Sequence, residues 1–409
     1  MPNSYYKKIF FLCIVLAIGR FAFDMYIPSL GVIANEFGVE YGVIEQTMAS
    51  FLLGITFTQL LFGPLADYWG RRYVLLLGFS IFIFGSLICI FSNGAEMLVI
   101  GRFLCGAGLS VGPCLKRALL VDWFANNKKL LFKASGAVSS VLMFATMIAP
   151  YLGGILQDYS GAWQLSFILI AIWGALLVLY ISLLFKDKYK VANNFSAKAV
   201  TVDYTQILLD GKFIFYALAC GFVFANMMVY FQLIPHIFTI DLLTSTKHIG
   251  YAASFAGLSY IAGGFMLPFI RTDCHHRLII KSLIIMALAS LLAEIIFTVY
   301  YQKIWLTLPL FWFFVAVRWM MPAVMAEAML NQQKSGTASA VLGFIQYLLS
   351  SILSFAFGFI GAELSPYVWF SQITVGSIII IFYMHFAGRA ATVEENKSGY
   401  ATSIADKAA

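Results

Sequence analysis

Twelve apolar runs of about 20 residues, separated by short polar stretches, constrain this chain more than any other feature. A helix of about 20 apolar residues, rising about 1.5 Å per residue, is long enough to cross the hydrocarbon core of a bilayer. The composition agrees, because only 11% of the residues are charged, whereas soluble domains have about 25%. The sequence therefore predicts an all-α integral membrane protein with spans at about 8–28, 43–63, 73–92, 95–115, 132–156, 162–185, 211–235, 246–270, 277–298, 303–325, 337–360 and 364–388.

The lysines and arginines between the spans fall almost entirely on one side. Arg71 and Arg72 lie there with most other basic residues, whereas the opposite loops hold only Lys247 and Lys303. Because basic loops stay in the cytoplasm, we predict that both termini are cytoplasmic.

Residues 186–210 form the longest internal polar segment and divide the predicted spans six and six. Two six-span halves are typical of transporters built from repeats. We therefore predict an N-terminal six-helix bundle at 1–185, a cytoplasmic linker at 186–210, a C-terminal six-helix bundle at 211–388 and a disordered cytoplasmic tail at 389–409.

Several functional classes are excluded by the sequence. The net charge of +7 comes from loop residues that set membrane orientation, so we expect no nucleic-acid partner. The six cysteines lack Cys-x-x-Cys spacing and indicate neither a metal site nor disulfides. No His-Glu-x-x-His or Gly-x-Ser-x-Gly motif is present, so we do not expect an enzyme. The N-terminal segment contains Arg20 and Asp24 and lacks a cleavage site, which favours a retained first span over a signal peptide.

A polar island at residues 63–72 joins the second and third predicted spans. We expect a tight turn here, with Pro64 ending the preceding helix and Asp67 capping or pairing across the loop. The island resembles the loop 2-3 signature of the major facilitator superfamily, which it matches at Gly63, Leu65, Asp67, Gly70, Arg71 and Arg72. The resemblance implies two six-helix bundles, with Asp67 and Arg71 as a cytoplasmic gate that locks the outward-facing state. The alternative is that the arginines only mark topology.

Five charged residues lie inside predicted spans, namely Arg20, Asp24, Arg102, Glu294 and Arg318. Each costs at least about 2.5–3.5 kcal/mol inside a bilayer, so each needs a partner or a function. If span one ends at Pro28, Asp24 lies about 6 Å and Arg102 about 10 Å below the outer surface. We therefore expect Asp24 to meet Arg102, with Arg20 one helical turn away. We expect Glu294 to be structural.

Two interpretations of the three charges in spans one and four remain open. In the first, Arg20, Asp24 and Arg102 form a permanently ionised structural cluster. In the second, Asp24 takes up and releases a proton, or meets a cationic substrate, while Arg102 acts as its switching partner. Burial favours a neutral carboxyl and a neighbouring arginine favours an ionised one, so Asp24 can titrate near neutrality only where the arginines are displaced or occupied.

Spans four and five carry two further resemblances. Span four resembles the superfamily's second signature, an intramembrane arginine followed by Gly-x-Gly, at Arg102, Gly106 and Gly108, which implies a part in proton transfer. Its glycines also let neighbouring helices approach closely. Span five resembles a signature of the antiporter branch, with alanines at 145 and 149 in place of glycine. The hinge residues would then be Gly136, Pro150, Gly153 and Gly154, and the alternative is a generic small-residue packing face.

Residues 24–28 (Asp-Met-Tyr-Ile-Pro) resemble the Asp-Met-Tyr-Leu-Pro motif of the Bcr/CflA and MdfA-like multidrug:proton antiporters. The resemblance implies export of drugs or other small amphipathic solutes, driven by the proton gradient without a cofactor. Two departures are Arg20 and the absence of an acid in residues 9–19. A positive charge beside Asp24 repels cations and attracts anionic or zwitterionic solutes.

The substrates of facilitators bind near the midplane between the two halves. Polar or adaptable side chains on the spans expected there suit a binding surface that accepts many shapes. The candidates are Tyr26, Met143, Thr146, Met147, Asn226, Tyr230, Gln232, Gln346 and Tyr347.

Taken together, these patterns predict a monomeric, multi-pass, proton-coupled transporter of a bacterial inner membrane. Its partners would be a small-molecule substrate, protons and the lipid bilayer. Two alternatives remain: an importer, or an exporter of an endogenous metabolite such as a siderophore, in the same fold; and a membrane receptor that does not transport.

Overall fold

The computed structural model describes residues 2–124, 128–185, 197–239, 246–270, 275–299, 303–329, 335–360 and 364–385. Its labelled helices are α1 (Pro2–Asp24), η1 (Ile27–Ser29), α2 (Leu30–Phe37), α3 (Tyr41–Trp69), α4 (Arg71–Ile90), α5 (Ala95–Leu109), α6 (Val111–Phe124), α7 (Lys128–Ser160), α8 (Gln164–Leu183), α9 (Ala197–Leu208), α10 (Gly211–Thr239), α11 (Thr246–Met266), η2 (Leu267–Phe269), α12 (His275–Val299), η3 (Lys303–Leu306), α13 (Thr307–Met329) and α14 (Ser335–Phe357). A last helix, Ser365–His385, follows.

The predicted all-α fold class is confirmed. Within the described ranges, twelve helical segments are long and apolar enough to cross a membrane. Span one is longer than predicted, because α1, η1 and α2 together make one segment, Tyr5–Phe37, in place of 8–28. Span four is broken in the same way at Ser110, between α5 and α6.

The prediction that Pro64 ends the second span was wrong. Pro64 lies inside α3, which continues to Trp69, and Gly63 is likewise helical. The helix ends at Gly70, whose φ of 89° is readily adopted only by glycine. A proline inside a helix removes one backbone hydrogen bond, and here a side chain of α9 bonds the carbonyl that loses its donor. The loop that joins the two spans is therefore a single residue.

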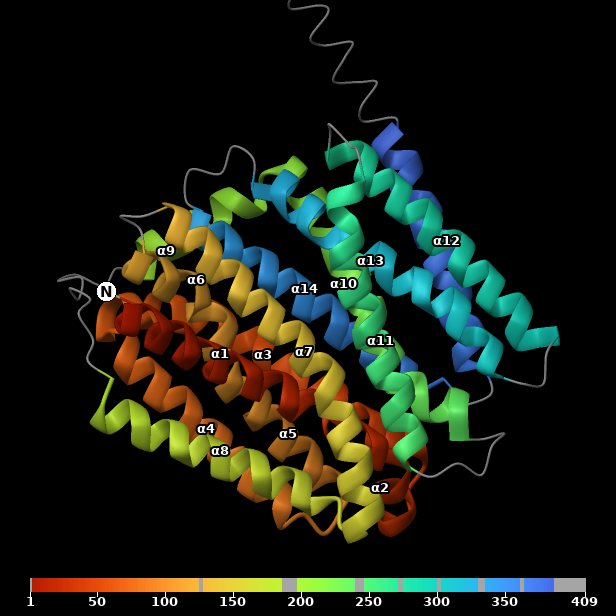
Figure 1. Cartoon of the computed structure of the whole chain (residues 1–409), viewed down its shortest axis with the longest axis horizontal. Coiled ribbons are helices and arrows are strands. Elements are labelled where there is room, and N and C mark those ends of the chain that lie inside the picture. Colours follow the sequence, from red (N-terminus) through yellow and green to blue (C-terminus); the bar gives the residue numbers. More distant parts are fainter. Residues whose placement is uncertain are drawn as a thin grey trace, which may run out of the picture.

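The two halves of the chain pack along two helix pairs. Figure 1 shows α7, in yellow, running beside α11, in green, and these two helices are in extensive contact, as are α3 and α14. At the end of the bundle opposite the N-terminus, the halves meet backbone to backbone. There a Cβ added at Gly358 would lie 3.1 Å from the carbonyl oxygen of Gly42, and one added at Gly250 would lie 2.7 Å from that of Pro150.

The segment predicted as the linker is helical over Ala197–Leu208, where it forms α9. Figure 1 shows α9 near α6, at the end of the bundle that also holds the N-terminus. We call this end, which also carries Arg71 and Arg72, the basic end. Residues 186–196 and the predicted tail, 389–409, lie outside the described residues.

Candidate functional site

Asp24 is the last residue of α1, at a break in the first span. The chain leaves the α-helix at Met25 and Tyr26 and resumes it at Leu30 after the short helix η1. A carboxylate at a helix C-terminus faces the negative end of the helix dipole, so it needs a cation nearby. Arg20, one turn earlier, supplies it: Nη2 lies 2.8 Å from Oδ2 of Asp24 and donates to Oδ1 at 3.1 Å. Asp24 is completely buried.

The depth estimated for Asp24 from the sequence was wrong, because the first span does not end at Pro28. Phe37 ends the span, thirteen residues beyond Asp24, which corresponds to about 20 Å of helix. Asp24 therefore lies much deeper within its span than predicted.

Arg102 of α5 does not pair with Asp24, contrary to the expectation. Its Nη1 donates to the carbonyl oxygen of Ala22 at 2.7 Å, one of the last carbonyls of α1, which have no donor within the helix. The guanidinium carbon lies 4.2 Å from the ring centroid of Tyr26 and 4.3 Å from that of Phe51. In the described part of the chain, its Nε and Nη2 make no hydrogen bond. Arg102 therefore caps α1 at the break, two residues before Asp24.

Arg20 connects the N-terminal half to the rest of the site. Its Nε donates to Oγ1 of Thr146 on α7 at 3.0 Å. Its guanidinium carbon lies 5.9 Å from the ring centroid of Phe231 on α10, which belongs to the other half. Thr146, a predicted cavity residue, therefore contacts the charged pair directly.

A second buried carboxylate, Glu45, was missed in the sequence. It lies on α3 within the predicted span 43–63, and its residue exposure is 1%. The rule that identified Asp24, a charge inside an apolar run, identifies Glu45 equally well. Two residues further on, the hydroxyl of Thr47 lies 2.5 Å from that of Tyr26, so this part of α3 borders the break in span one.

The loop residues predicted as a gate form a charged cluster that also includes α6. Arg71 lies 2.6 Å from Asp67 through Nη1 and 3.3 Å from Asp122 of α6 through Nε. Arg72 donates to the carbonyl oxygen of Ser182 on α8 at 2.5 Å. Asp122 was missed because it falls among the basic residues after span four, where the sequence indicated only a loop.

The small residues of spans four and five pack at close range. A Cβ at Gly106 would overlap the carbonyl oxygen of Phe51, and one at Gly153 would overlap that of Met25. Both contacts lie within the N-terminal half, whereas the carbonyl oxygen of Pro150 lies close to Gly250 of the C-terminal half. A Cβ at Gly136 would meet nothing within 4 Å, so the predicted hinge residues do not share one environment.

The predicted cavity residues of the C-terminal half contact one another's helices. Asn226 accepts a hydrogen bond from Gln372 of the last helix at 2.8 Å, and Tyr230 donates to the carbonyl oxygen of Ala252 at 3.3 Å. Gln346 of α14 donates to Sγ of Cys220 on α10, and Gln232 of α10 donates to the carbonyl oxygen of Ser354 on α14 at 3.0 Å. The remaining candidates, Met143, Met147 and Tyr347, are partly exposed.

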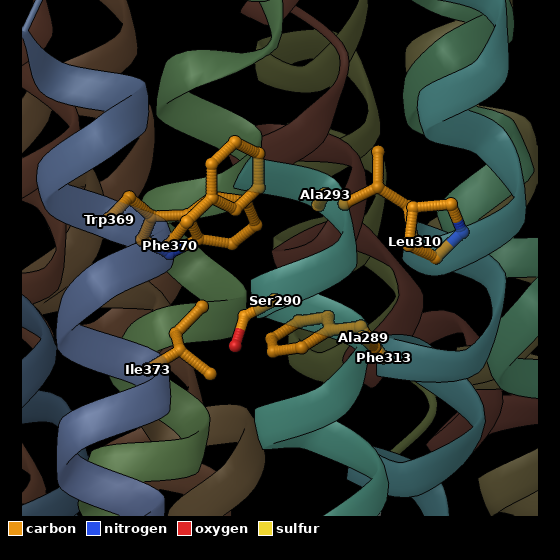
Figure 2. Close-up of a pocket in the computed structure, with 9 residues that line it drawn as sticks. Ala289, Ser290, Ala293, Leu310, Phe313, Trp369, Phe370 and Ile373 are labelled. Carbon is orange, nitrogen blue, oxygen red and sulfur yellow. The ribbon is translucent and has the colours of Figure 1, made fainter. Parts of the chain in front are cut away.

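A small apolar cavity lies inside the C-terminal half, away from these charges. Its lining comes from α12, α13 and the last helix, and Figure 2 shows the Ser290 hydroxyl near its centre. That hydroxyl lies 2.7 Å from Oγ1 of Thr374. Among the described residues, no three His, Cys, Asp or Glu side chains are grouped as metal ligands.

Comparison with known proteins places this geometry in a family. Residues 12–355 match the family model described as Major Facilitator Superfamily. The "Uncharacterized MFS-type transporter YdgK" of Bacillus subtilis (strain 168) is 29% identical over 350 residues, which cover 84% of this chain and 87% of the relative. The "Multidrug transporter MdfA" of Yersinia pestis bv. Antiqua (strain Angola) is 28% identical over 251 residues, 59% of each protein.

The fold is similar to that of solved transporters at much lower sequence identity. The structure of the POT family transporter PepTSo superimposes with a TM-score of 0.75 at 13% identity, covering 95% of this chain and 98% of that one. Because the family model matches most of the sequence, the chain belongs to the Major Facilitator Superfamily and is a multi-pass membrane transporter, not an enzyme.

Proposed function

We propose that this protein is a proton-coupled secondary transporter that moves a small organic solute across a bacterial inner membrane by alternating access. The observation that carries the proposal is the ion pair between Arg20 and the completely buried Asp24 at the break in span one. Ionisable groups inside membrane spans mark substrate paths and proton relays. Broken helices near the midplane, in turn, provide the ion sites of many secondary transporters.

The coupling step that we propose is a change of partner at Asp24. In the first state of this step, Asp24 is ionised and holds the contact with Arg20 that the structure shows. A proton on Asp24 would release Arg20, and a movement of α5 against α1 would bring the unused Nη2 and Nε of Arg102 to a deprotonated Asp24. Two such arrangements provide the two states that alternating access needs.

The two halves are in contact at the end of the bundle opposite the basic end, which supports a state that is closed at that end. Gly42 meets Gly358 there, and the rings of Tyr151 and Tyr251 stack at 5.6 Å between centroids. With cytoplasmic termini, this is a state closed to the periplasm. We propose that Asp67 and Arg71 act as the gate that stabilises the opposite, outward-facing state.

Two candidate functions share this machinery. Export of drugs or similar amphipathic compounds in exchange for protons is supported by the Asp-Met-Tyr-Ile-Pro motif of the Bcr/CflA branch and by the relative named as a multidrug transporter. Transport of an endogenous metabolite, including import, is favoured by Arg20, which places a positive charge where a cationic drug would have to bind.

The decisive experiment uses inside-out vesicles with an acid interior, a pH-sensitive dye, and a panel of cationic, zwitterionic and anionic solutes. We expect a solute to trigger a change of internal pH with the wild type and with Glu40→Gln, which alters an exposed acid at the N-terminus of α3, but not with Asp24→Asn. Full proton-coupled activity in folded Asp24→Asn protein would refute the role of Asp24. No response to any solute in the wild type would leave the charged cluster with a structural role.

A further inference from the structure

Arg318 of α13 is a third intramembrane arginine, after Arg20 and Arg102. It faces α11, the helix that packs against α7 of the other half. In the described ranges, no Asp or Glu oxygen lies within 4.0 Å of it, and its enclosed Nε has no hydrogen-bond partner. Its guanidinium carbon lies 5.4 Å from the ring centroid of Tyr260 on α11. A Cβ at Gly264 of α11 would lie 3.1 Å from Nε, so the glycine makes room for the guanidinium.

Arg20 faces the same region from the N-terminal half. Its side chain is 20% exposed, although its partner Asp24 is completely enclosed. It donates from Nε to Thr146 and from Nη2 to Asp24, and within the described part of the chain Nη1 makes no hydrogen bond. The guanidinium therefore has a donor left for a further partner.

Packing between α11 and α7 brings the two arginines to one region. A Cβ added at Gly257 of α11, one turn before Tyr260, would lie 2.8 Å from Cα of Met147 on α7, and Met147 follows Thr146, to which Arg20 donates. Because α11 packs directly against α7, which holds Thr146, the two guanidinium groups lie on two sides of one boundary region.

We propose that Arg20 and Arg318 form the two sides of a binding site for a carboxylate group of the transported solute, with Tyr260 at its edge. The inference rests on the proposed function and favours its second candidate.

The charges support an anionic group over a cationic one. Asp24 balances Arg20, whereas neither Arg102 nor Arg318 has a carboxylate within 4.0 Å among the residues that the structure describes. Even when the buried Glu45 is counted with Asp24, the three arginines of this region outnumber the carboxylates by one. Such an excess positive charge is costly inside a membrane unless an anion balances it. The planar guanidinium forks match the two oxygens of a carboxylate and bind it through paired, charge-assisted hydrogen bonds.

An anionic solute would also change how protons are coupled to transport. The charged groups that act on Asp24 are Arg20 from its own helix and Arg102 from α5. A solute carboxylate competes with Asp24 for Arg20, so protonation of Asp24 strengthens binding of the anion. Proton and anion then bind together and cross together, and the inward proton gradient drives uptake. A cationic solute would compete with the proton for Asp24 and would be exchanged for it.

The test compares three ligands of similar size but different charge, namely benzoate, benzamide and benzylamine, with the full-length protein in detergent. We expect benzoate to raise the Tm more than benzamide or benzylamine, and to bind more tightly at mildly acidic pH, where it is still ionised, than at neutral pH. Arg318→Gln should weaken benzoate binding about tenfold or more, since a hydrogen bond to a charged group is lost. Arg277→Gln, which removes an exposed arginine from α12, should leave it unchanged.

Arg318→Lys keeps the charge without the fork and should bind benzoate with intermediate affinity, which tests the site even if Arg318→Gln does not fold. The inference is overturned if benzylamine stabilises the wild type best, if benzoate acts no better than benzamide, or if both Arg318 variants bind benzoate as the wild type does. Failure of the proposed function is distinguishable. Benzoate binding that depends on Arg318, without proton movement in proteoliposomes under any solute, would support the anion site and refute proton-coupled transport.

Discussion

The hydroxyl of Tyr204 donates a hydrogen bond of 3.1 Å to the backbone carbonyl oxygen of Leu60. In an uninterrupted helix this carbonyl would accept from the N–H of residue 64, but that residue is Pro64, which has none. Helix α9 of the linker thus supplies the donor that α3 lacks. The contact attaches the linker to the N-terminal half near the basic end.

Removing this hydroxyl should loosen the attachment. We expect Tyr204→Phe to lower the free energy of unfolding by about 1 kcal/mol, the usual net value of one hydrogen bond, and to speed proteolysis within the linker. Tyr159→Phe removes the same group from a side chain that is 94% exposed and should change neither. The measurement is the Tm in detergent together with limited proteolysis. Equal Tm values for the two variants would contradict the prediction.

The same contact predicts a dependence on alkaline pH. Burial, reinforced by the negative charges of nearby groups, raises the pKa of Tyr204 to about 12, above the ordinary value of about 10. A raised pKa in the folded state means that the stabilisation is complete below about pH 10 and is lost as the pH rises toward 12. The difference in stability between wild type and Tyr204→Phe should therefore be constant from neutral pH to about pH 10 and shrink above it.

Two glycines with opposite surroundings give contrasting substitutions. Gly106→Leu would force α5 away from Phe51 on α3, and we expect it to destabilise the protein by several kcal/mol or to prevent folding. Gly136→Ala meets open space inside a helix and should stabilise the protein by about 0.5–1 kcal/mol. Thermal unfolding of both variants tests this, and a destabilised Gly136→Ala would show that α7 needs a hinge at this residue.

Arg71 holds two carboxylates through two different nitrogen atoms, a geometry that lysine cannot reproduce. We expect Arg71→Lys to separate α6 from the end of α3, lowering the Tm and slowing transport while the solute still binds. Arg277→Lys, on an exposed surface, serves as the control. Transport at the wild-type rate in Arg71→Lys would show that positive charge alone is sufficient here.

Glu45 is the second deeply buried carboxylate near the break in span one. Glu45→Gln keeps the size of the side chain and removes its charge, and we expect it to reduce proton-driven transport without abolishing it, because Asp24 remains. Glu40→Gln changes an exposed acid at the start of the same helix and should transport normally. Equal rates in the two variants would exclude Glu45 from the proton path.

The twelve spans could be predicted because crossing a bilayer imposes a length and a composition that are visible residue by residue. The bounds of individual helices could not. Pro64 was expected to end α3, because a proline removes one backbone hydrogen bond. The hydroxyl of Tyr204 replaces the missing donor at the carbonyl of Leu60, from which it is separated by 144 residues in the sequence. A partner so remote leaves no local signal.

The sequence identified charged residues of the candidate site, but it did not predict which of them contact each other. A charge in an apolar run identifies Asp24 and Arg102, yet the estimate of their depth assumed a first span that ends at Pro28. The helix breaks at Met25 instead, and the break exposes the carbonyl of Ala22, to which Arg102 donates. The acceptor of an arginine depends on the local backbone geometry, and a depth calculated from the rise per residue does not describe that geometry.

The contact between Gly42 and Gly358 closes one end of the bundle without a side chain from either residue. Any larger residue would act as a wedge in this closed state and would leave the opposite state untouched. Its steric cost would therefore shift populations between the two states, about tenfold for each 1.4 kcal/mol. The two glycines would then set how the transporter divides its time between the two states, although neither belongs to the charged site.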